Sequence, residues 1–244
     1  MCIAGGRIDS LTQASFGRAE DVRPGQVKQI RAHEHIFYEG DDRSSLYVVE
    51  SGWVKLYRTL IDGQRQVVGF ANAGSILGLE SDDTYANGCE TITPVTLRTI
   101  PGRSLKDICQ RDPLLAEQLL RQVGRQLGAA QAQLAAVGAQ SAEQKLASFL
   151  LSVADLCDAT HGGEFDLPMR RGDMAEFLGL RLETVSRKMS EFQRRGWIEM
   201  TSLYHCRIAR RHTLQELAQG GACSDAASSA IPPRARPTTS GLAA

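Results

Sequence analysis

The sequence lacks the features that mark a membrane-spanning, exported or disulfide-stapled protein. No run approaches the ~18–20 consecutive apolar residues that a membrane-spanning helix needs. The opening segment, Met1–Arg7, contains no apolar core of a secretory signal. The six cysteines include no C-x-x-C pair, so neither a zinc module nor a disulfide framework is indicated. We therefore expect a protein of the reducing cytoplasm with no membrane partner.

The motifs that most enzymes need are also lacking. There is no Ser/His/Asp arrangement, no Walker loop and no dinucleotide-binding glycine motif, because the Gly-Gly pairs at Gly5 and Gly162 are isolated. The five histidines include no ligand pair at helical spacing. His33 and His35 could face the same side of a strand, which leaves a haem or metal role open beside the simpler interpretation as surface or turn residues. We predict no enzyme, no catalytic residue, no metal and no cofactor.

The chain has no net charge, with 28 Lys and Arg against 28 Asp and Glu, but it has a basic segment. Between residues 168 and 212, ten Lys and Arg stand against five Asp and Glu, a net charge of +5. Such a segment fits either a nucleic-acid-binding module or a solvated protein face. Charge alone does not distinguish the two.

Short apolar-alternating runs separated by turn residues fill the segment from Gln26 to Pro101. Asp62-Gly63 between two such runs predicts a hairpin, because glycine accepts the positive φ that tight hairpin turns require. Many short strands at this spacing predict an all-β sandwich or barrel. With 244 residues, the chain has room for more than this one domain.

A heptad pattern follows the strands. Its apolar positions step by three and four, which predicts a narrow helical seam that suits a partner helix better than a broad core. The alternative is an amphipathic helix packed on its own β domain. The seam consists of Leu120, Val123, Leu127, Ala130, Leu134 and Val137.

Two short helices joined by a turn that contains Gly179 predict a helix-turn-helix, and a following hairpin predicts its wing. On the second helix, Glu183, Ser186 and Arg187 share one face near the N-terminus, where recognition helices meet base edges. The alternative is a surface ion pair between Glu183 and Arg187. Predicted contacts to DNA phosphates are Arg170, Arg171, Arg181, Thr184, Lys188 and Arg195.

The segment from Met169 to Arg187 resembles the helix-turn-helix of the CRP/FNR superfamily of bacterial transcription regulators, in particular the FNR and FixK branch with its Glu-x-x-Ser-Arg motif. Upstream, Tyr38–Asp41 and Ser51–Tyr57 are similar to the opening of that family's β-roll. The resemblance covers about residues 25–217. It implies a homodimer that binds a TTGAT-N4-ATCAA-like palindrome of double-stranded DNA and acts on RNA polymerase.

The departures from the family pattern concern the signal. Leu79 and Tyr85-Ala86 stand where cyclic-AMP-binding members have a Glu and an Arg-Ser pair that hold the phosphate. Arg98 replaces the cysteine of the β-roll that ligates an iron–sulfur cluster in FNR, and Cys2 is the one cysteine in the first 88 residues. We therefore expect neither cyclic AMP nor a cluster.

The resulting prediction is an α+β protein: a FixK-like regulator, chiefly an activator, in a low-oxygen, respiratory or nitrogen-metabolism circuit. The alternative is a haem-dependent sensor of nitric oxide or carbon monoxide in the same superfamily. The expected segments are a flexible arm (1–24), a β-roll sensor-like domain (25–111), a dimerisation helix (112–140), a winged helix-turn-helix domain (141–217) and a disordered tail (218–244).

Overall fold

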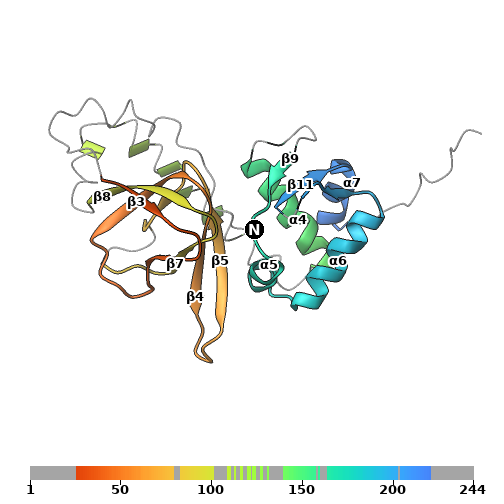
Figure 1. Cartoon of the computed structure of the whole chain (residues 1–244), viewed down its shortest axis with the longest axis horizontal. Helices are drawn as coiled ribbons and strands as arrows, with labels where there is room; N and C mark the ends of the chain where they lie inside the picture. The colour runs from red at the N-terminus through yellow and green to blue at the C-terminus, as the bar shows by residue number, and fades with distance from the viewer. Residues whose placement is uncertain are drawn as a thin grey trace, which may run out of the picture.

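The computed structural model describes residues 26–79, 83–101, single positions between 109 and 131, and 140–157, 159, 164–202 and 204–220. Its two halves lie side by side, the strands of the N-terminal half next to the helices of the C-terminal half (Figure 1). The predicted N-terminal arm and the predicted tail beyond residue 220 lie outside the described residues. None of the helices in the described part is long and apolar enough to cross a bilayer.

The N-terminal half is a β-roll of two antiparallel sheets, as expected. One sheet has the strand order β1-β8-β3-β6 and the other β2-β7-β4-β5. The strands are β1 (Val27–Ile30), β2 (His35–Phe37), β3 (Ser45–Ser51), β4 (Val54–Thr59), β5 (Arg65–Ala71), β6 (Ile76–Leu77), β7 (Gly88–Thr91) and β8 (Val95–Pro101).

The hairpin predicted at Asp62-Gly63 joins β4 to β5. Gly63 has φ +79°, the left-handed conformation that an L side chain disfavours. The turn closes through hydrogen bonds from Gly63 N to Leu60 O (2.9 Å) and from Leu60 N to Gln64 O (2.8 Å). In the β4–β5 pair that this turn joins, Val54, Leu56 and Tyr57 of β4 are buried.

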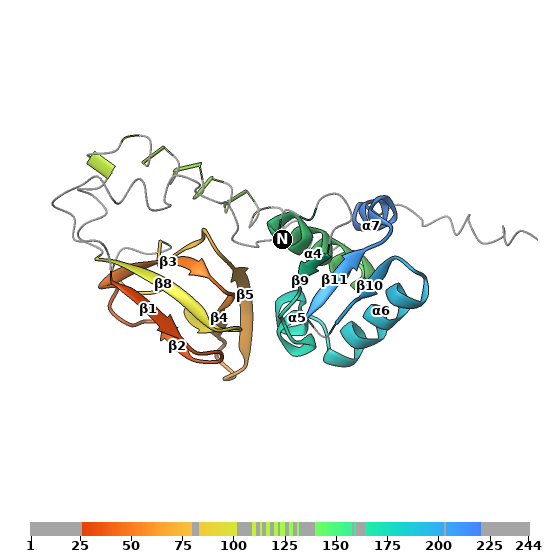
Figure 2. The same cartoon turned by 45° about the horizontal axis from the view of Figure 1, so that its top comes forward.

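The described positions between Cys109 and Gln131 are helical, and we call this segment the connecting helix. Figure 2 shows its traced pieces running past the β-roll toward the C-terminal half. Leu120, Val123 and Leu127 are exposed by 73%, 45% and 58%, so the chain's own core does not cover this part of the predicted seam. The seam positions Ala130, Leu134 and Val137 lie outside the described residues.

The C-terminal half is a helix-turn-helix with a wing, also as expected. The wing sheet has the order β10-β11-β9, so a third strand that the sequence pattern did not predict joins the expected hairpin. A last helix, α7, was not predicted either. The elements are α4 (Ala142–Leu156), β9 (Glu164–Asp166), α5 (Arg171–Leu178), α6 (Leu182–Arg194), β10 (Ile198–Met200), β11 (His205–Ile208) and α7 (Arg211–Ala218).

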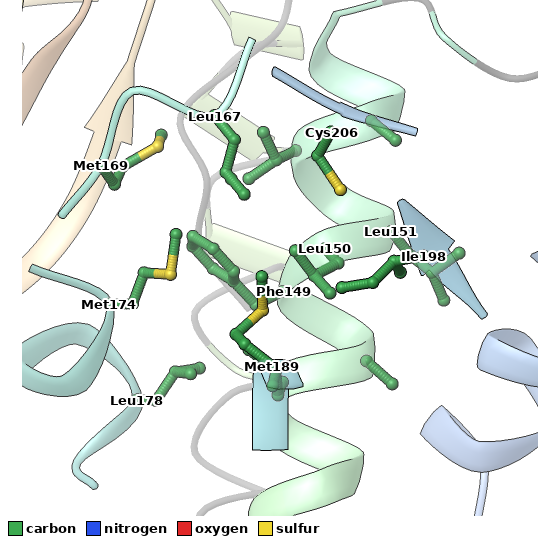
Figure 3. Packing of buried hydrophobic residues seen from close by; sticks show 14 of the residues in the cluster. Phe149, Leu150, Leu151, Leu167, Met169, Met174, Leu178, Met189, Ile198 and Cys206 are labelled. Carbon is green, nitrogen blue, oxygen red and sulfur yellow. The ribbon is translucent and has the colours of Figure 1, made fainter. Parts of the chain in front are cut away.

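Helix α4 is the centre of the C-terminal core. Ser141 caps its N-terminus by accepting from Gln144 N, and the Gln144 side chain accepts from Ser141 N in return, a capping box. Its buried face packs against α5, α6 and the wing, and Figure 3 shows Phe149 and Leu150 beside Met174 and Met189. This packing fixes both helices of the helix-turn-helix on one scaffold.

The two halves share a single hydrophobic cluster, which the sequence pattern did not predict. Trp53, Val67, Phe70 and Ile92 of the β-roll are buried in the same cluster as α4 and α5. The ring of Phe70 on β5 lies with its centroid 5.2 Å from that of Phe177 on α5. The β-roll therefore supports the helix-turn-helix directly.

Candidate DNA-binding interface

Helices α5 and α6 meet at a tight turn. Gly179 ends α5 with φ +62°, and its N–H donates to Ala175 O. Leu180 N donates to the same carbonyl at 3.0 Å. A left-handed residue at this point is the usual helix C-cap, and it redirects the chain into the next helix. The geometry is that of a helix-turn-helix.

Helix α6 is divided into a buried face and a solvent face. Val185, Met189 and Phe192 are buried in the core, with exposures of 1% or less. Glu183 and Arg187 are exposed and Ser186 is half-buried on the outer side. The expected division of the helix is therefore present, and the three predicted base-reading residues lie on the face that the core leaves open.

The interpretation of Glu183 and Arg187 as a surface ion pair finds no support in the geometry. Within the described ranges, neither side chain has an ion pair within 4.0 Å. Glu183 instead lies in the first turn of α6, where the helix dipole favours a carboxylate. Both side chains are thus available for a partner outside the chain.

The N-terminus of α6 begins without a side-chain cap. Arg181 occupies the N-cap position in extended conformation, and its side chain makes no capping bond. Its carbonyl accepts from Thr184 N (3.0 Å) and Val185 N (3.1 Å). Arg181 is exposed and Thr184 half-buried, so a guanidinium stands beside the positive end of the α6 dipole.

Two of the predicted phosphate contacts are paired within the protein. Lys188 Nζ contacts Glu143 of α4 and lies 2.9 Å from Glu191, and hydrogen bonds to these two carboxylates raise the pKa of Lys188. Arg195 lies 2.6 Å from Glu191 and 4.9 Å above the Trp197 ring. The contact of Lys188 with Glu143 joins α6 to α4 and has no signal in the sequence spacing, whereas the contacts of Arg195 lie at the C-terminal end of α6 itself.

Two further predicted phosphate contacts also lie against the protein. Arg170 Nη2 is 3.0 Å from His33 Nε2 of the β-roll. Arg171 is half-buried beside the sulfur of Met174 (3.5 Å), and burial lowers the pKa of its guanidinium. Burial also raises the pKa of the neighbouring Cys206 thiol to about 12.

A buried tyrosine stands at the position that the resemblance aligns with the phosphate-holding Arg-Ser pair of cyclic-AMP-binding members. Tyr85 is 4% exposed, stacks on Phe37 with ring centroids 3.9 Å apart, and donates its hydroxyl hydrogen bond to Ser45 O at 2.7 Å. Burial raises the pKa of this phenol, which stays protonated. A neutral, hydrogen-bonded ring offers no charge to a phosphate.

The two histidines considered for haem or metal have different partners. His33 lies in the turn between β1 and β2 and contacts Arg170, whereas His35 lies on β2 with Nδ1 3.2 Å from the Tyr57 hydroxyl. In the part of the chain that the structure describes, no three His, Cys, Asp or Glu side chains gather as a metal site would require.

Comparison with known proteins identifies the class. Residues 144–217 match the Crp-like helix-turn-helix domain, and residues 27–112 match the cyclic nucleotide-binding domain. A β-roll of this kind joined to a winged helix-turn-helix defines the CRP/FNR transcription regulators, and the chain belongs to this family. Among its members it is FixK-like.

The relatives that show this family membership match most of the chain. It is 32% identical over 209 residues to the nitrogen fixation regulation protein FixK of Rhizobium meliloti, across 85% of this chain and 94% of that protein. It is 36% identical over 193 residues to the transcriptional activatory protein AadR of Rhodopseudomonas palustris, across 78% of each. The structure of FixK2 from Bradyrhizobium japonicum superposes with a TM-score of 0.73 at 29% identity, over 82% of this chain and 98% of that one.

Proposed function

We propose that this protein is a homodimeric, sequence-specific transcription regulator that reads a TTGAT-N4-ATCAA-like palindrome and activates transcription through RNA polymerase. FixK is named for the regulation of nitrogen fixation, which supports a role in nitrogen metabolism. AadR is named a transcriptional activatory protein, which supports the activator role. The observation that carries the proposal is the open face of α6, where Glu183, Ser186 and Arg187 stand opposite a fully buried face.

In this proposal the three residues divide the recognition chemistry. The Arg187 guanidinium binds guanine O6 and N7, Glu183 accepts from cytosine N4, and Ser186 serves in either sense. Arg181 and Thr184 bind phosphate at the N-terminus of α6. Lys188 and Arg195 would have to leave their carboxylate partners to reach a phosphate, so we assign them to holding α6.

We further propose that the protein needs neither cyclic AMP nor an iron–sulfur cluster. The buried Tyr85 ring occupies the position of the phosphate-binding Arg-Ser pair, and its stacking on Phe37 fills the space. Arg98, where a cluster ligand would stand, contacts Glu50 instead. A protein of this kind is competent as soon as the dimer has formed, and its cellular amount sets its activity.

The proposal is tested by fluorescence anisotropy of the aerobically purified, ligand-free protein at a stated salt concentration near physiological. We expect nanomolar binding to a TTGAT-N4-ATCAA duplex and far weaker binding to a scrambled duplex. Arg187→Ala should cost about 1–3 kcal/mol on the palindrome and little on the scramble. Arg181→Ala, on the same helix end, is the control and should weaken both duplexes alike.

Two results would contradict the proposal in different ways. Equal losses on both duplexes for Arg187→Ala would remove the base-reading role. Weak, equal binding of the unmodified protein to both duplexes would mean that a signal is missing. A Soret band in protein from haem-supplied cells would then favour the haem-dependent sensor.

A further inference from the structure

A cavity of about 680 Å³ lies between the two halves of the molecule. One wall comes from the β-roll, with Trp53 after β3 and Ile92 after β7, and the other from Leu156, Arg170 and Tyr204 of the C-terminal half. The volume falls within the range of about 300–1,000 Å³ that is usual for small-molecule sites. Tyr85 does not line this cavity.

The cavity has an apolar part. Trp53 and Ile92 are 5% and 7% exposed and belong to the cluster that joins the two halves, and Leu156 packs against that cluster. A large indole beside two aliphatic side chains provides a surface for a ring or hydrocarbon group.

The charged groups that line the cavity are unequally neutralised. Glu50 is paired with Arg98, and the Asp166 carboxylate lies 3.0 Å from His205 Nδ1. By contrast, among the residues that the structure describes no carboxylate lies within 4.0 Å of the Arg170 guanidinium, whose hydrogen-bond partner is His33 Nε2 at 3.0 Å. An imidazole accepts this bond only when its Nε2 is unprotonated, so it supplies no negative charge. Among the described residues, the Arg170 guanidinium is therefore a positive charge on the cavity wall with no carboxylate beside it.

His33 is held in an unfavourable backbone conformation at this place. Its φ of +64° is the one positive value among the described non-glycine residues, and its N–H donates to Thr91 O at 2.9 Å. A side chain in the left-handed region is strained. This backbone hydrogen bond therefore holds His33 in place despite the strain, with its imidazole in contact with Arg170.

We propose that this cavity binds a small organic anion, an acid group on an apolar, ring-bearing body. The acid group is held by the Arg170 guanidinium, and His33 lies beside it on the cavity wall. The ring lies against Trp53 and Ile92. Charge-assisted bonds from a guanidinium to an oxyanion are the strong polar contacts of such a site. The inference concerns the cavity and does not depend on the identity of the DNA sequence.

The experiment uses two dyes that differ by the acid group, on the full-length protein. Anilinonaphthalene sulfonate is an aromatic anion, and phenylnaphthylamine is its uncharged counterpart. Binding is followed by the dye fluorescence itself, excited directly in the absorption band of the dye. We expect the sulfonate to saturate one site per chain and to bind more tightly than the uncharged dye.

Variants locate the site. Arg170→Gln should weaken the sulfonate dye by about tenfold or more, the size of a lost charged hydrogen bond, and leave the uncharged dye unchanged. Arg194→Gln, an exposed arginine on α6 outside the cavity, is the matched control and should change neither. Ala73→Trp, which fills the cavity, should remove both, provided that circular dichroism matches the parent protein.

Three results would overturn the proposal. They are no saturable binding of the sulfonate, equal affinity of the two dyes, and an unchanged sulfonate affinity in Arg170→Gln. Arg170 is exposed, so Arg170→Gln should fold. Its dye affinity can therefore be interpreted whether or not Ala73→Trp folds.

Discussion

At the scale of single residues, Tyr85 determines what the β-roll offers to a ligand. Its ring takes the space between Phe37 and the strand that carries Ser45, and Gly78 leaves the clearance for it, because a Cβ at Gly78 would meet the ring at 3.0 Å. The aromatic side chain contributes packing and a satisfied hydroxyl at once.

Removal of this ring should therefore destabilise the protein without creating a nucleotide site. We expect Tyr85→Ala to lower the free energy of unfolding by about 3–5 kcal/mol, as for other buried aromatic truncations, measured by urea denaturation at fixed protein concentration. Tyr38→Ala, at a tyrosine that is 52% exposed, is the control and should cost less than about 1 kcal/mol. Stabilisation of either variant, or of the parent, by cyclic AMP would contradict this account.

At the scale of elements, the connecting helix and α6 show apolar side chains used in opposite ways. In α6 they point into the core, whereas Leu120, Val123 and Leu127 of the connecting helix are exposed in the single chain. Exposed leucines at heptad spacing are costly unless a second helix covers them. This is the reason to propose that a second copy of the chain does so.

Leu127→Asp should therefore abolish the dimer. A carboxylate in an apolar seam is not neutralised by a partner and loses its hydration, so sedimentation should show a monomer at micromolar concentration. Gln131→Asp adds the same charge beside the seam and should remain dimeric. A dimeric Leu127→Asp protein would show that the contact between copies lies elsewhere.

At the scale of the whole molecule, an ion-pair network joins the two halves. Lys55 of β4 lies 2.8 Å from Asp173 of α5 and 3.4 Å from Glu90 of β7. Burial lowers the pKa of Lys55, but the two carboxylates outweigh burial and raise it. Asp173 also accepts from Arg170 N at 3.0 Å and so caps α5. One carboxylate thus fixes the first helix of the helix-turn-helix to the β-roll.

Lys55→Gln should loosen this connection. It leaves Asp173 and Glu90 without their shared cation, and we expect a loss of about 2–4 kcal/mol in the free energy of unfolding, somewhat less than for a fully buried pair. Arg58→Gln, which breaks the exposed pair with Glu39 on the same strand, should cost less than about 1 kcal/mol. If Lys55→Gln and Arg58→Gln lowered the free energy of unfolding equally in urea denaturation, the network would not be what joins the two halves.

The sequence predicts local features of this molecule well and distant contacts poorly. Three features depend on residues that are close together in the sequence, and the structure contains all of them. They are the hairpin at Asp62-Gly63, the turn at Gly179 and the two faces of α6. Helix α7 was missed, because its eight residues are too few for a clear period.

Contacts across the chain leave no local signal. Lys55 and Asp173 are 118 positions apart, and Lys188 and Glu143 are 45 apart. Lys188 suggests phosphate binding when the sequence alone is considered, because its partner Glu143 lies on another helix and is far away in the sequence. The open face of α6 was therefore expected from the sequence, and its role in reading bases stays a prediction. Which basic side chains near α6 are paired within the protein is known only from the packing.

The contact of β5 with α5 has a consequence for engineering. Phe70 packs between Phe149 and Phe177, and the Gln66 side chain donates to Glu176 O. The hairpin of the N-terminal half therefore completes the C-terminal half, and the two are not interchangeable modules. A chimera that grafts this helix-turn-helix onto a foreign sensor therefore has to bring β4 and β5 along.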